Sequence, residues 1–160
     1  MIIFVLLVAA SIHRCSAAEL TKSPVHWLNV AYDEGAIYGY PKTIQAIILA
    51  ESSACEQTLG DDGYSYGCGQ LALNTAALVE GRPIHARDLQ WDHYRNIHDA
   101  SLYFALCLAS LHSWRRAIAG YNHGIPKAAL MTDAQINADP YLKAIIARLT
   151  FLLHIKQELN

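Results

Sequence analysis

The sequence has few charged residues, few cysteines and little net charge, and each shortage excludes a class of protein. Charged residues make up 16% of the 160 residues and hydrophobic residues 53%, the reverse of the balance in disordered chains. Four cysteines, nine glycines and five prolines are too few for a disulfide miniprotein or a collagen-like repeat. A formal net charge of −2 gives no general attraction to nucleic acid, so we expect no nucleic-acid partner.

The chain also lacks internal repeats and long linkers, so its length predicts one domain. Its N-terminus differs in character, because residues 2–12 are apolar except for one serine. A run of about 11 residues is too short to cross a bilayer but has the length of the apolar part of a signal peptide. Small residues at 16–18 suit cleavage, although no Lys or Arg precedes the run. We expect residues 1–18 to be an export signal and residues 19–160 to be an exported or periplasmic domain, an uncleaved anchor being the alternative.

Three cysteines remain after the expected signal: Cys55, Cys68 and Cys107. In an oxidising compartment one pair can form a disulfide bond while the third thiol stays free. Cys55 can pair with Cys68, enclosing a glycine-rich segment, or with Cys107, and the spacing does not decide between them. The spacing fits no zinc pattern and the histidines are scattered, so we expect no metal and no cofactor.

The apolar residues after the signal are mostly spaced as on helices. Ile44, Ile47 and Ile48 follow the i, i+3, i+4 pattern, and Pro41 suits the first turn of that helix. Two further apolar stripes comprise Leu102, Tyr103, Leu106 and Cys107, and then Leu142, Ile145, Ile146, Leu149, Leu152 and Leu153. Another helix is expected over residues 74–80, whereas the glycines within residues 59–69 exclude one. A mainly helical domain follows from these patterns.

Glu51 continues the apolar face that Ile44, Ile47 and Ile48 begin. Burial of a carboxyl group penalises its charged form and raises its pKa, which suits a general acid near neutral pH. The alternative is a glutamate at the end of a helix that turns out to solvent.

Two polar segments supply groups that suit a sugar ligand. Residues 60–71 combine glycines with Tyr64, Tyr66 and Gln70, which offer flat rings and an amide. Residues 120–124 place Tyr121 and Asn122 between glycines, a pattern also typical of a helix that ends at a glycine cap.

Taken together, these segments resemble the soluble lytic transglycosylase family, which cleaves peptidoglycan and shares the goose-type lysozyme fold. Glu51-Ser52 resembles the catalytic Glu-Ser pair of that family. Residues 65–70 with Thr75-Ala76 resemble its Ser-x-Gly-Leu-Met-Gln and Thr-Ala signature. Asn96-Ile97 leads into a helix that resembles its Asn-Ile and Tyr-Leu helix, and residues 120–124 resemble Ala-Tyr-Asn-Ala-Gly.

The resemblance implies a mainly α, lysozyme-like domain with a glycine-rich loop or β-hairpin beside the active-site cleft. It implies a lyase that cleaves the β-1,4 bond between N-acetylmuramic acid and N-acetylglucosamine and leaves 1,6-anhydro ends, with Glu51 as the only general acid and base. The residues it implies for substrate binding are Ser52, Ser65, Tyr66, Gln70, Tyr121, Asn122 and Tyr141. Glycan strands of peptidoglycan are the expected partner, and we expect a monomer.

The sequence departs from the family pattern at two places and leaves alternatives open. Cys68-Gly69 stands where the family has Leu-Met, and Gly120 stands where it has alanine. A hydrolase on the same fold would need a water-holding group such as Asp61 or Asp62, although these residues are typical of a turn. A wall-binding component without activity, serving a secretion, conjugation or phage assembly, is the third alternative.

Two other features carry no assigned role at this level. Arg115-Arg116 is typical of a solvated helix face, although it could bind an acidic peptide stem. His123 lies inside the Tyr-Asn motif, and the sequence alone gives it no function.

Overall fold

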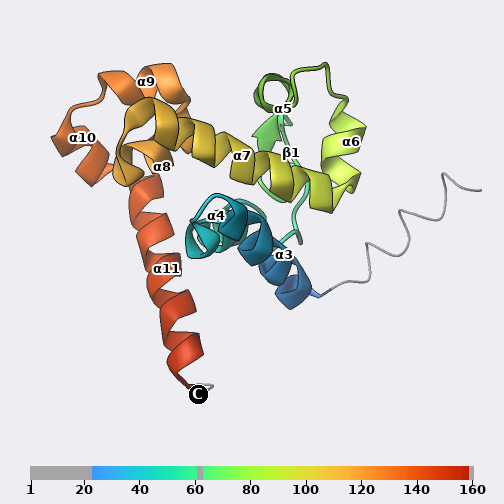
Figure 1. Cartoon of the computed structure of the whole chain (residues 1–160), viewed down its shortest axis with the longest axis horizontal. Coiled ribbons are helices and arrows are strands. Elements are labelled where there is room, and N and C mark those ends of the chain that lie inside the picture. Colours follow the sequence, from blue (N-terminus) through green and yellow to red (C-terminus); the bar gives the residue numbers. More distant parts are fainter. Residues whose placement is uncertain (1–22, 61–62, 159–160) are drawn as a thin grey trace, which may run out of the picture.

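A computed structural model describes residues 23–60 and 63–158 of the chain (Figure 1). Its helices and strands, in chain order, are α3 Pro24–Ile37, α4 Pro41–Ser52, β1 Ser65–Tyr66, β2 Leu71–Ala72, α5 Leu73–Glu80, α6 Ala86–Trp91, α7 His93–Leu111, α8 Trp114–His123, α9 Ile125–Leu130, α10 Asp133–Ala138 and α11 Pro140–Glu158. The described part of the chain is mainly helical with one small hairpin, so the predicted fold class is confirmed. The expected export signal at residues 1–18 lies outside the described residues.

The helix α4 is the most deeply buried short helix and begins at Pro41, as its sequence predicts. Ile44, Ile47 and Ile48 are at most 1% exposed, so the predicted apolar face is confirmed. The preceding helix α3 packs closely against α4, and Gly35 permits this approach. A Cβ atom at position 35 would lie 2.8 Å from Cα of Pro41, closer than real contacts allow.

The helix α7 runs through the whole molecule and separates two groups of elements (Figure 1). The hairpin, α5 and α6 lie toward its N-terminal end, and α8 and α9 lie toward its C-terminal end. Its fully buried face comprises Ile97, Ala100, Phe104 and Cys107. The predicted stripe is therefore right in part, because Leu102 and Leu106 are only half-buried and the face is rotated toward Phe104.

The last helix, α11, packs on α4 and α8 along one side, which comprises Leu142, Ile145, Leu149 and Leu152. Leu142 and Ile145 are buried, whereas Ile146 is 38% and Leu153 is 53% exposed. The predicted stripe is therefore right in part, because Ile146 and Leu153 lie beside it and are exposed; the end of α11 extends away from the other helices (Figure 1).

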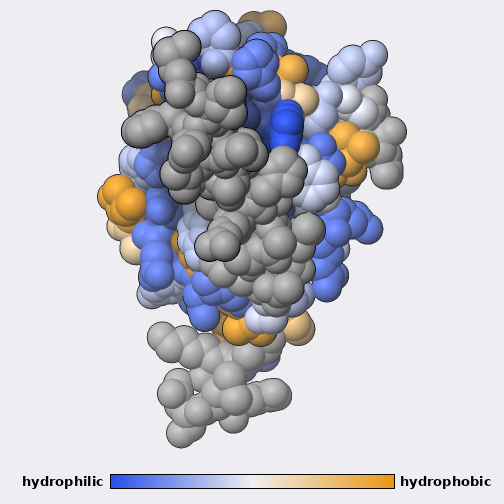
Figure 2. All heavy atoms as spheres, turned by 90° about the vertical axis from the view of Figure 1, so that its right-hand side faces the viewer, coloured by the Kyte–Doolittle hydropathy of each residue, from blue (hydrophilic) through white to orange (hydrophobic). Residues whose placement is uncertain are grey.

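The surface carries its apolar side chains in separate groups. The face seen in Figure 2 is mostly hydrophilic, with hydrophobic residues in small patches between hydrophilic ones, a normal distribution for a protein surface. Within the described residues, none of the helices combines the length and the apolar character that a bilayer crossing needs.

The strands β1 and β2 form an antiparallel hairpin in which Ser65 pairs with Ala72 and Tyr66 pairs with Leu71. The short loop between them contains Cys68, which forms a disulfide bond with Cys55 just after α4. Cys107 is a buried free thiol. The structure thus decides between the two pairings that the sequence leaves open, and it joins the glycine-rich segment covalently to the end of α4.

We predict that replacing both Cys55 and Cys68 with serine lowers the free energy of unfolding by about 3 kcal/mol, the cost expected for opening a loop of this length. Denaturant unfolding of the wild type with and without dithiothreitol should give the same loss. The matched control is Cys107→Ala, whose unfolding should keep its sensitivity to the reductant. A wild-type unfolding midpoint that does not respond to reductant would contradict the pairing.

Candidate active site

Glu51 lies in the last turn of α4, where the apolar face of that helix reaches a cleft. Its carboxyl group is partly buried, and this desolvation raises the pKa of Glu51 to about 7. Two groups on α11 act in the opposite direction: the hydroxyl of Tyr141, which donates to Oε1 of Glu51, and the positive charge of Arg148. The carboxyl group is therefore about half protonated at neutral pH, as a general acid requires.

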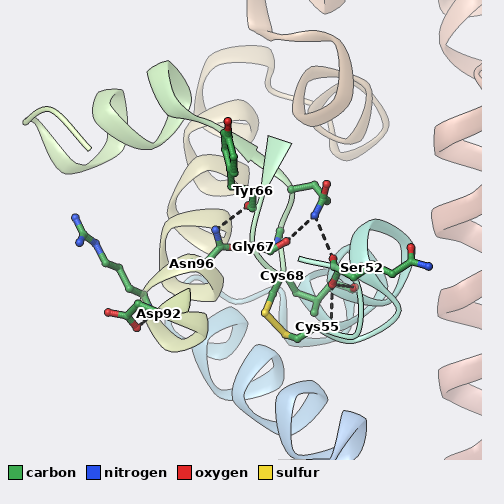
Figure 3. Close-up of a disulfide and its surroundings, with 12 residues drawn as sticks. Ser52, Cys55, Tyr66, Gly67, Cys68, Asp92 and Asn96 are labelled. Carbon is green, nitrogen blue, oxygen red and sulfur yellow. Dashed lines mark hydrogen bonds between the residues drawn. A yellow bond between two sulfur atoms is a disulfide. The ribbon is translucent and has the colours of Figure 1, made fainter. Parts of the chain in front are cut away.

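A tight turn follows Glu51 and ends α4. Ser53, Ala54 and Cys55 all have positive φ angles, of 53°, 60° and 70°, a conformation that residues with a Cβ atom rarely adopt. The hydroxyl of Ser52 donates to the carbonyl of Ile48 (3.1 Å) and accepts the N–H of Cys55 (2.9 Å). Consecutive strained residues persist only where the surroundings fix them. Ser52 and the disulfide bond provide that fixation directly beside Glu51 (Figure 3).

The hairpin beside the cleft is anchored by one fully buried amide, that of Asn96 on α7 (Figure 3). Its Oδ1 accepts the N–H of Gly69 (2.7 Å), and its Nδ2 donates to the carbonyl of Tyr66 (3.0 Å). The chain passes so close to α7 that a Cβ atom at Gly67 would lie 2.2 Å from the Asn96 side chain, and the φ angle there is +76°. Gly67 of the hairpin motif and Asn96 of the Asn-Ile motif thus pack directly against each other and together hold the hairpin on α7.

Gln70 follows this turn and lines the cleft. Its backbone has a φ angle of 48°, and its Nε2 donates to the carbonyls of Gly67 (2.8 Å) and Gln57 (3.2 Å). These two bonds fix the amide group, so Oε1 is the atom of Gln70 that is suited to accept a hydrogen bond from a ligand.

Tyr121 closes the side of the cleft formed by α8. Its hydroxyl donates to the carbonyl of Gly69 (2.8 Å), and burial raises its pKa well above the usual value, so it stays a neutral donor. Both glycines at the positions that depart from the resembled pattern lie close to other side chains. A Cβ atom at Gly69 would lie 2.6 Å from Cβ of Ala100, and one at Gly120 would lie 2.6 Å from Cδ1 of Leu111.

These groups surround a cleft of about 440 Å³, large enough for a sugar unit. Its lining comprises Glu51, Gln57, Leu59, Gly60, Ser65, Gln70, Tyr121 and Asn122. Among the residues that the structure describes, Glu51 is the one carboxylate in this lining. Asp61 and Asp62, the candidates for a water-holding group, lie outside the described residues.

The structure therefore brings together five of the eight residues expected in the site: Glu51, Ser65, Gln70, Tyr121 and Asn122. Tyr141 lies behind Glu51 and contacts its carboxyl group. Ser52 is fully buried with its hydroxyl bonded to backbone groups, and Tyr66 donates its hydroxyl to the carbonyl of Gly63. Both support the backbone around the cleft and do not belong to its lining.

Gly60 begins the glycine-rich segment expected near a ligand, but two other lining residues, Gln57 and Leu59, were not expected from the sequence. They belong to the segment between Cys55 and the hairpin, which the sequence marks only as non-helical. The disulfide pairing was the missing information, because it folds this segment back against the end of α4.

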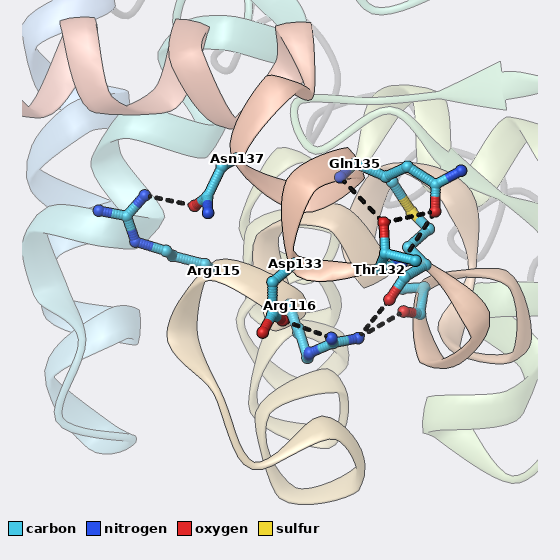
Figure 4. A network of polar contacts seen from close by, with 8 residues as sticks. Arg115, Arg116, Thr132, Asp133, Gln135 and Asn137 are labelled. Atoms are coloured by element: carbon cyan, nitrogen blue, oxygen red, sulfur yellow. Dashed lines mark hydrogen bonds and ion pairs between the residues drawn. The ribbon is translucent and has the colours of Figure 1, made fainter.

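The arginines at the start of α8 do not line this cleft, and Figure 4 shows the contacts they make instead. Arg116 pairs with Asp133 (2.6 Å) and donates to the carbonyls of Ala128 and Met131, so it ties α8 to α9 and α10. Arg115 donates to Oδ1 of Asn137 (2.9 Å). The expectation of a purely solvated face is wrong for Arg116, which is half-buried.

Within the described residues no group of His, Cys, Asp or Glu is arranged to hold a metal ion.

Comparison with known proteins adds one finding to this geometry. The family model described as the transglycosylase SLT domain matches residues 31–139, well over half of the chain. The match includes Glu51, the hairpin, α7 and the Tyr-Asn segment. Neither the curated proteins nor the solved structures contain a significant match.

We predict that Glu51→Gln makes the fold more stable at pH 8 and leaves its stability unchanged at pH 4. The carboxyl group loses its proton near pH 4.5 in the unfolded chain and near 7 in the folded one, so its contribution to stability falls as pH rises between these values. Gln resembles the neutral carboxyl group and avoids this loss, worth about 2 kcal/mol once solvent access is allowed for.

Denaturant unfolding of both proteins at the two pH values measures the difference. Comparing the two proteins at the same pH cancels the contributions that other titrating groups make to stability. One such group is Asp99, whose pKa is also raised by burial. Equal stability at pH 8 would mean that Glu51 is not desolvated.

Proposed function

Because the chain belongs to the transglycosylase SLT domain family, whose members are typically lytic transglycosylases acting on peptidoglycan, we propose that Glu51 cleaves glycan strands as the single general acid and base. The bond cleaved is the β-1,4 bond between N-acetylmuramic acid and N-acetylglucosamine, and the product carries a 1,6-anhydro end. The observation that carries this proposal is the desolvated carboxyl group of Glu51, with a pKa of about 7, in the lining of the cleft.

In the first step neutral Glu51 gives its proton to the glycosidic oxygen as the bond from that oxygen to C1 breaks. The leaving sugar departs as an alcohol, and C1 becomes electron-poor. The new carboxylate of Glu51 accepts the hydrogen bond from Tyr141 and lies in the field of Arg148. Both groups favour the ionised form, so they stabilise the carboxylate at the moment it is created.

In the second step the carboxylate takes the proton of the 6-hydroxyl of the muramoyl sugar, and O6 forms a bond to C1. Glu51 is then neutral again and ready for the next strand. The nucleophile belongs to the substrate itself, so no water has to be positioned and one carboxyl group suffices. Glycosidases that use water or a protein nucleophile require two carboxyl groups across the bond.

The polar groups around Glu51 suit the binding of acetylated sugars. Oε1 of Gln70 and the amide of Asn122 offer hydrogen bonds within the cleft, and Ser65 adds a hydroxyl. The hydroxyl of Tyr121 is committed to the backbone of Gly69, so this ring contributes a rigid surface. In this proposal Ser52 and Tyr66 act indirectly, through the turn and the hairpin they support.

We also propose that the protein works in an oxidising, exported location. The disulfide bond between Cys55 and Cys68 supports this, because such bonds are rarely kept in a reducing cytosol. The apolar residues at 2–12 agree with export, and the mild net charge favours recognition through the cleft or through a partner assembly over long-range attraction.

The decisive experiment is mass spectrometry of the products released from purified peptidoglycan. We predict 1,6-anhydro ends from the wild type and a fall in rate of at least about 10³-fold for Glu51→Gln, since the proposed acid is removed. The matched control is Glu34→Gln. It removes a carboxylate of α3 that pairs with His98 of α7, and this variant should retain full activity.

Each other outcome favours a named alternative. Reducing ends would support a hydrolase that positions water, and full activity of Glu51→Gln would refute the role of Glu51. A wild type that binds peptidoglycan but releases nothing would support a wall-binding component.

A further inference from the structure

His123 lies at the C-terminal end of α8, next to Asn122 of the cleft. Its Nε2 lies 2.7 Å from Oδ2 of Asp139, the residue that precedes α11. The imidazole is 23% exposed, whereas the carboxylate is 3% exposed. This contact therefore connects α8 with the start of α11, and neither residue belongs to the lining of the cleft.

Asp139 is held as a carboxylate by several donors. Burial alone would raise its pKa, but the hydrogen bonds from His123 and from the backbone N–H groups of Leu142 and Tyr141 lower the pKa below its usual value. The bond from the N–H of Leu142 to Oδ1 measures 2.9 Å. Oδ1 thus caps the first turn of α11 while Oδ2 receives His123, so both oxygens of the side chain are used.

The cap fixes the position of the next residues of α11. Tyr141 is only two residues beyond Asp139, and its hydroxyl donates to Glu51. Arg148 lies seven residues further, on the same side of the helix, and acts on Glu51 through its charge. The two groups that favour the ionised form of Glu51 are therefore both placed by the register of α11.

We propose that His123 and Asp139 form a positioning pair that holds the start of α11 so that the hydroxyl of Tyr141 stays against the carboxyl group of Glu51. The proposal rests on the proposed function of Glu51. Without the pair, the first turn of α11 loses its cap and its link to α8, and Tyr141 moves away from the carboxylate it must stabilise. His123 is a positioning residue, since it acts through Asp139 and Tyr141.

A purely structural cap and a positioning pair predict different effects on Glu51. A structural cap affects only the stability of the fold. A positioning pair also sets the pKa of Glu51, because loss of the Tyr141 hydrogen bond removes a contribution that lowers it. The two oxygens of Asp139 bond to His123 and to the N–H of Leu142, whereas Tyr141 bonds to Glu51, so we expect removal of Asp139 to raise the pKa of Glu51 through the displacement of Tyr141.

The test is the titration of Glu51 by NMR of ¹³C-labelled carboxyl groups in the unliganded protein. We expect His123→Ala, Asp139→Ala and Tyr141→Phe each to raise the pKa of Glu51 by about 0.5 to 1 unit. The double variant of Asp139→Ala with Tyr141→Phe should raise it no further than Tyr141→Phe alone, because the two changes remove the same contact. His123→Gln retains an N–H donor and should lie closer to the wild type.

The matched control is Thr132→Ala, which removes the side-chain cap of α10, a helix that does not contribute to the cleft. It should lower the midpoint of denaturant unfolding and leave the pKa of Glu51 unchanged. On peptidoglycan, we expect His123→Ala to lower kcat about tenfold and to change KM by less than about twofold, because the lost contact matters when the carboxylate forms.

If His123→Ala and Asp139→Ala leave the pKa of Glu51 where Thr132→Ala leaves it, the pair is only a helix cap and the proposal is wrong. If Asp139→Ala does not fold, His123→Ala decides alone, since it leaves the cap of α11 intact. The titration needs no activity, so a wild type that is inactive on peptidoglycan would refute the proposed function separately.

Discussion

The desolvation of one carboxyl group, that of Glu51, is the constraint on which the rest of the site depends. An ionised carboxylate on the apolar face of α4 is costly, and the fold places donors from another helix around it. Tyr141 and Arg148 lower the pKa of Glu51, while burial raises it more, and the balance lies near 7. A fully exposed glutamate would be ionised at neutral pH, and one buried without Tyr141 would hold its proton too firmly to give it up.

The elements around Glu51 serve to keep that balance fixed. The strained turn at residues 53–55 ends α4 directly beside the acid, and the disulfide bond joins this turn to the hairpin that carries Gln70. Asn96 holds the hairpin on α7 from the other side. The turn and the hairpin beside Glu51 are thus held by a disulfide bond and by the buried amide of Asn96. Both resist displacement when a substrate enters the cleft.

Much of the fold and part of the site follow from local sequence patterns. The face of α4, the non-helical glycine segment and the glycine at the end of α8 are encoded within a few residues, and the structure confirms them. The exposure of Ile146 and Leu153 on α11 was not predictable, because an apolar stripe does not reveal how much of its width the partner helices cover. The pairing of Cys55 with Cys68, and hence the position of Gln57 and Leu59, depends on contacts between distant segments. The same holds for His123, whose partner lies 16 residues away. Ser52 differs, because its hydroxyl bonds to nearby backbone groups although its motif suggests the cleft.

The central claim is that Glu51 enters the reaction as a neutral acid, and the pH dependence of kcat/KM on soluble glycan strands tests it most directly. The free enzyme must hold the proton on Glu51, so the account predicts that kcat/KM falls tenfold for each pH unit above about 7. A profile that stays level from about pH 6 to 9, or that declines already near the ordinary pKa of a glutamate, would contradict it.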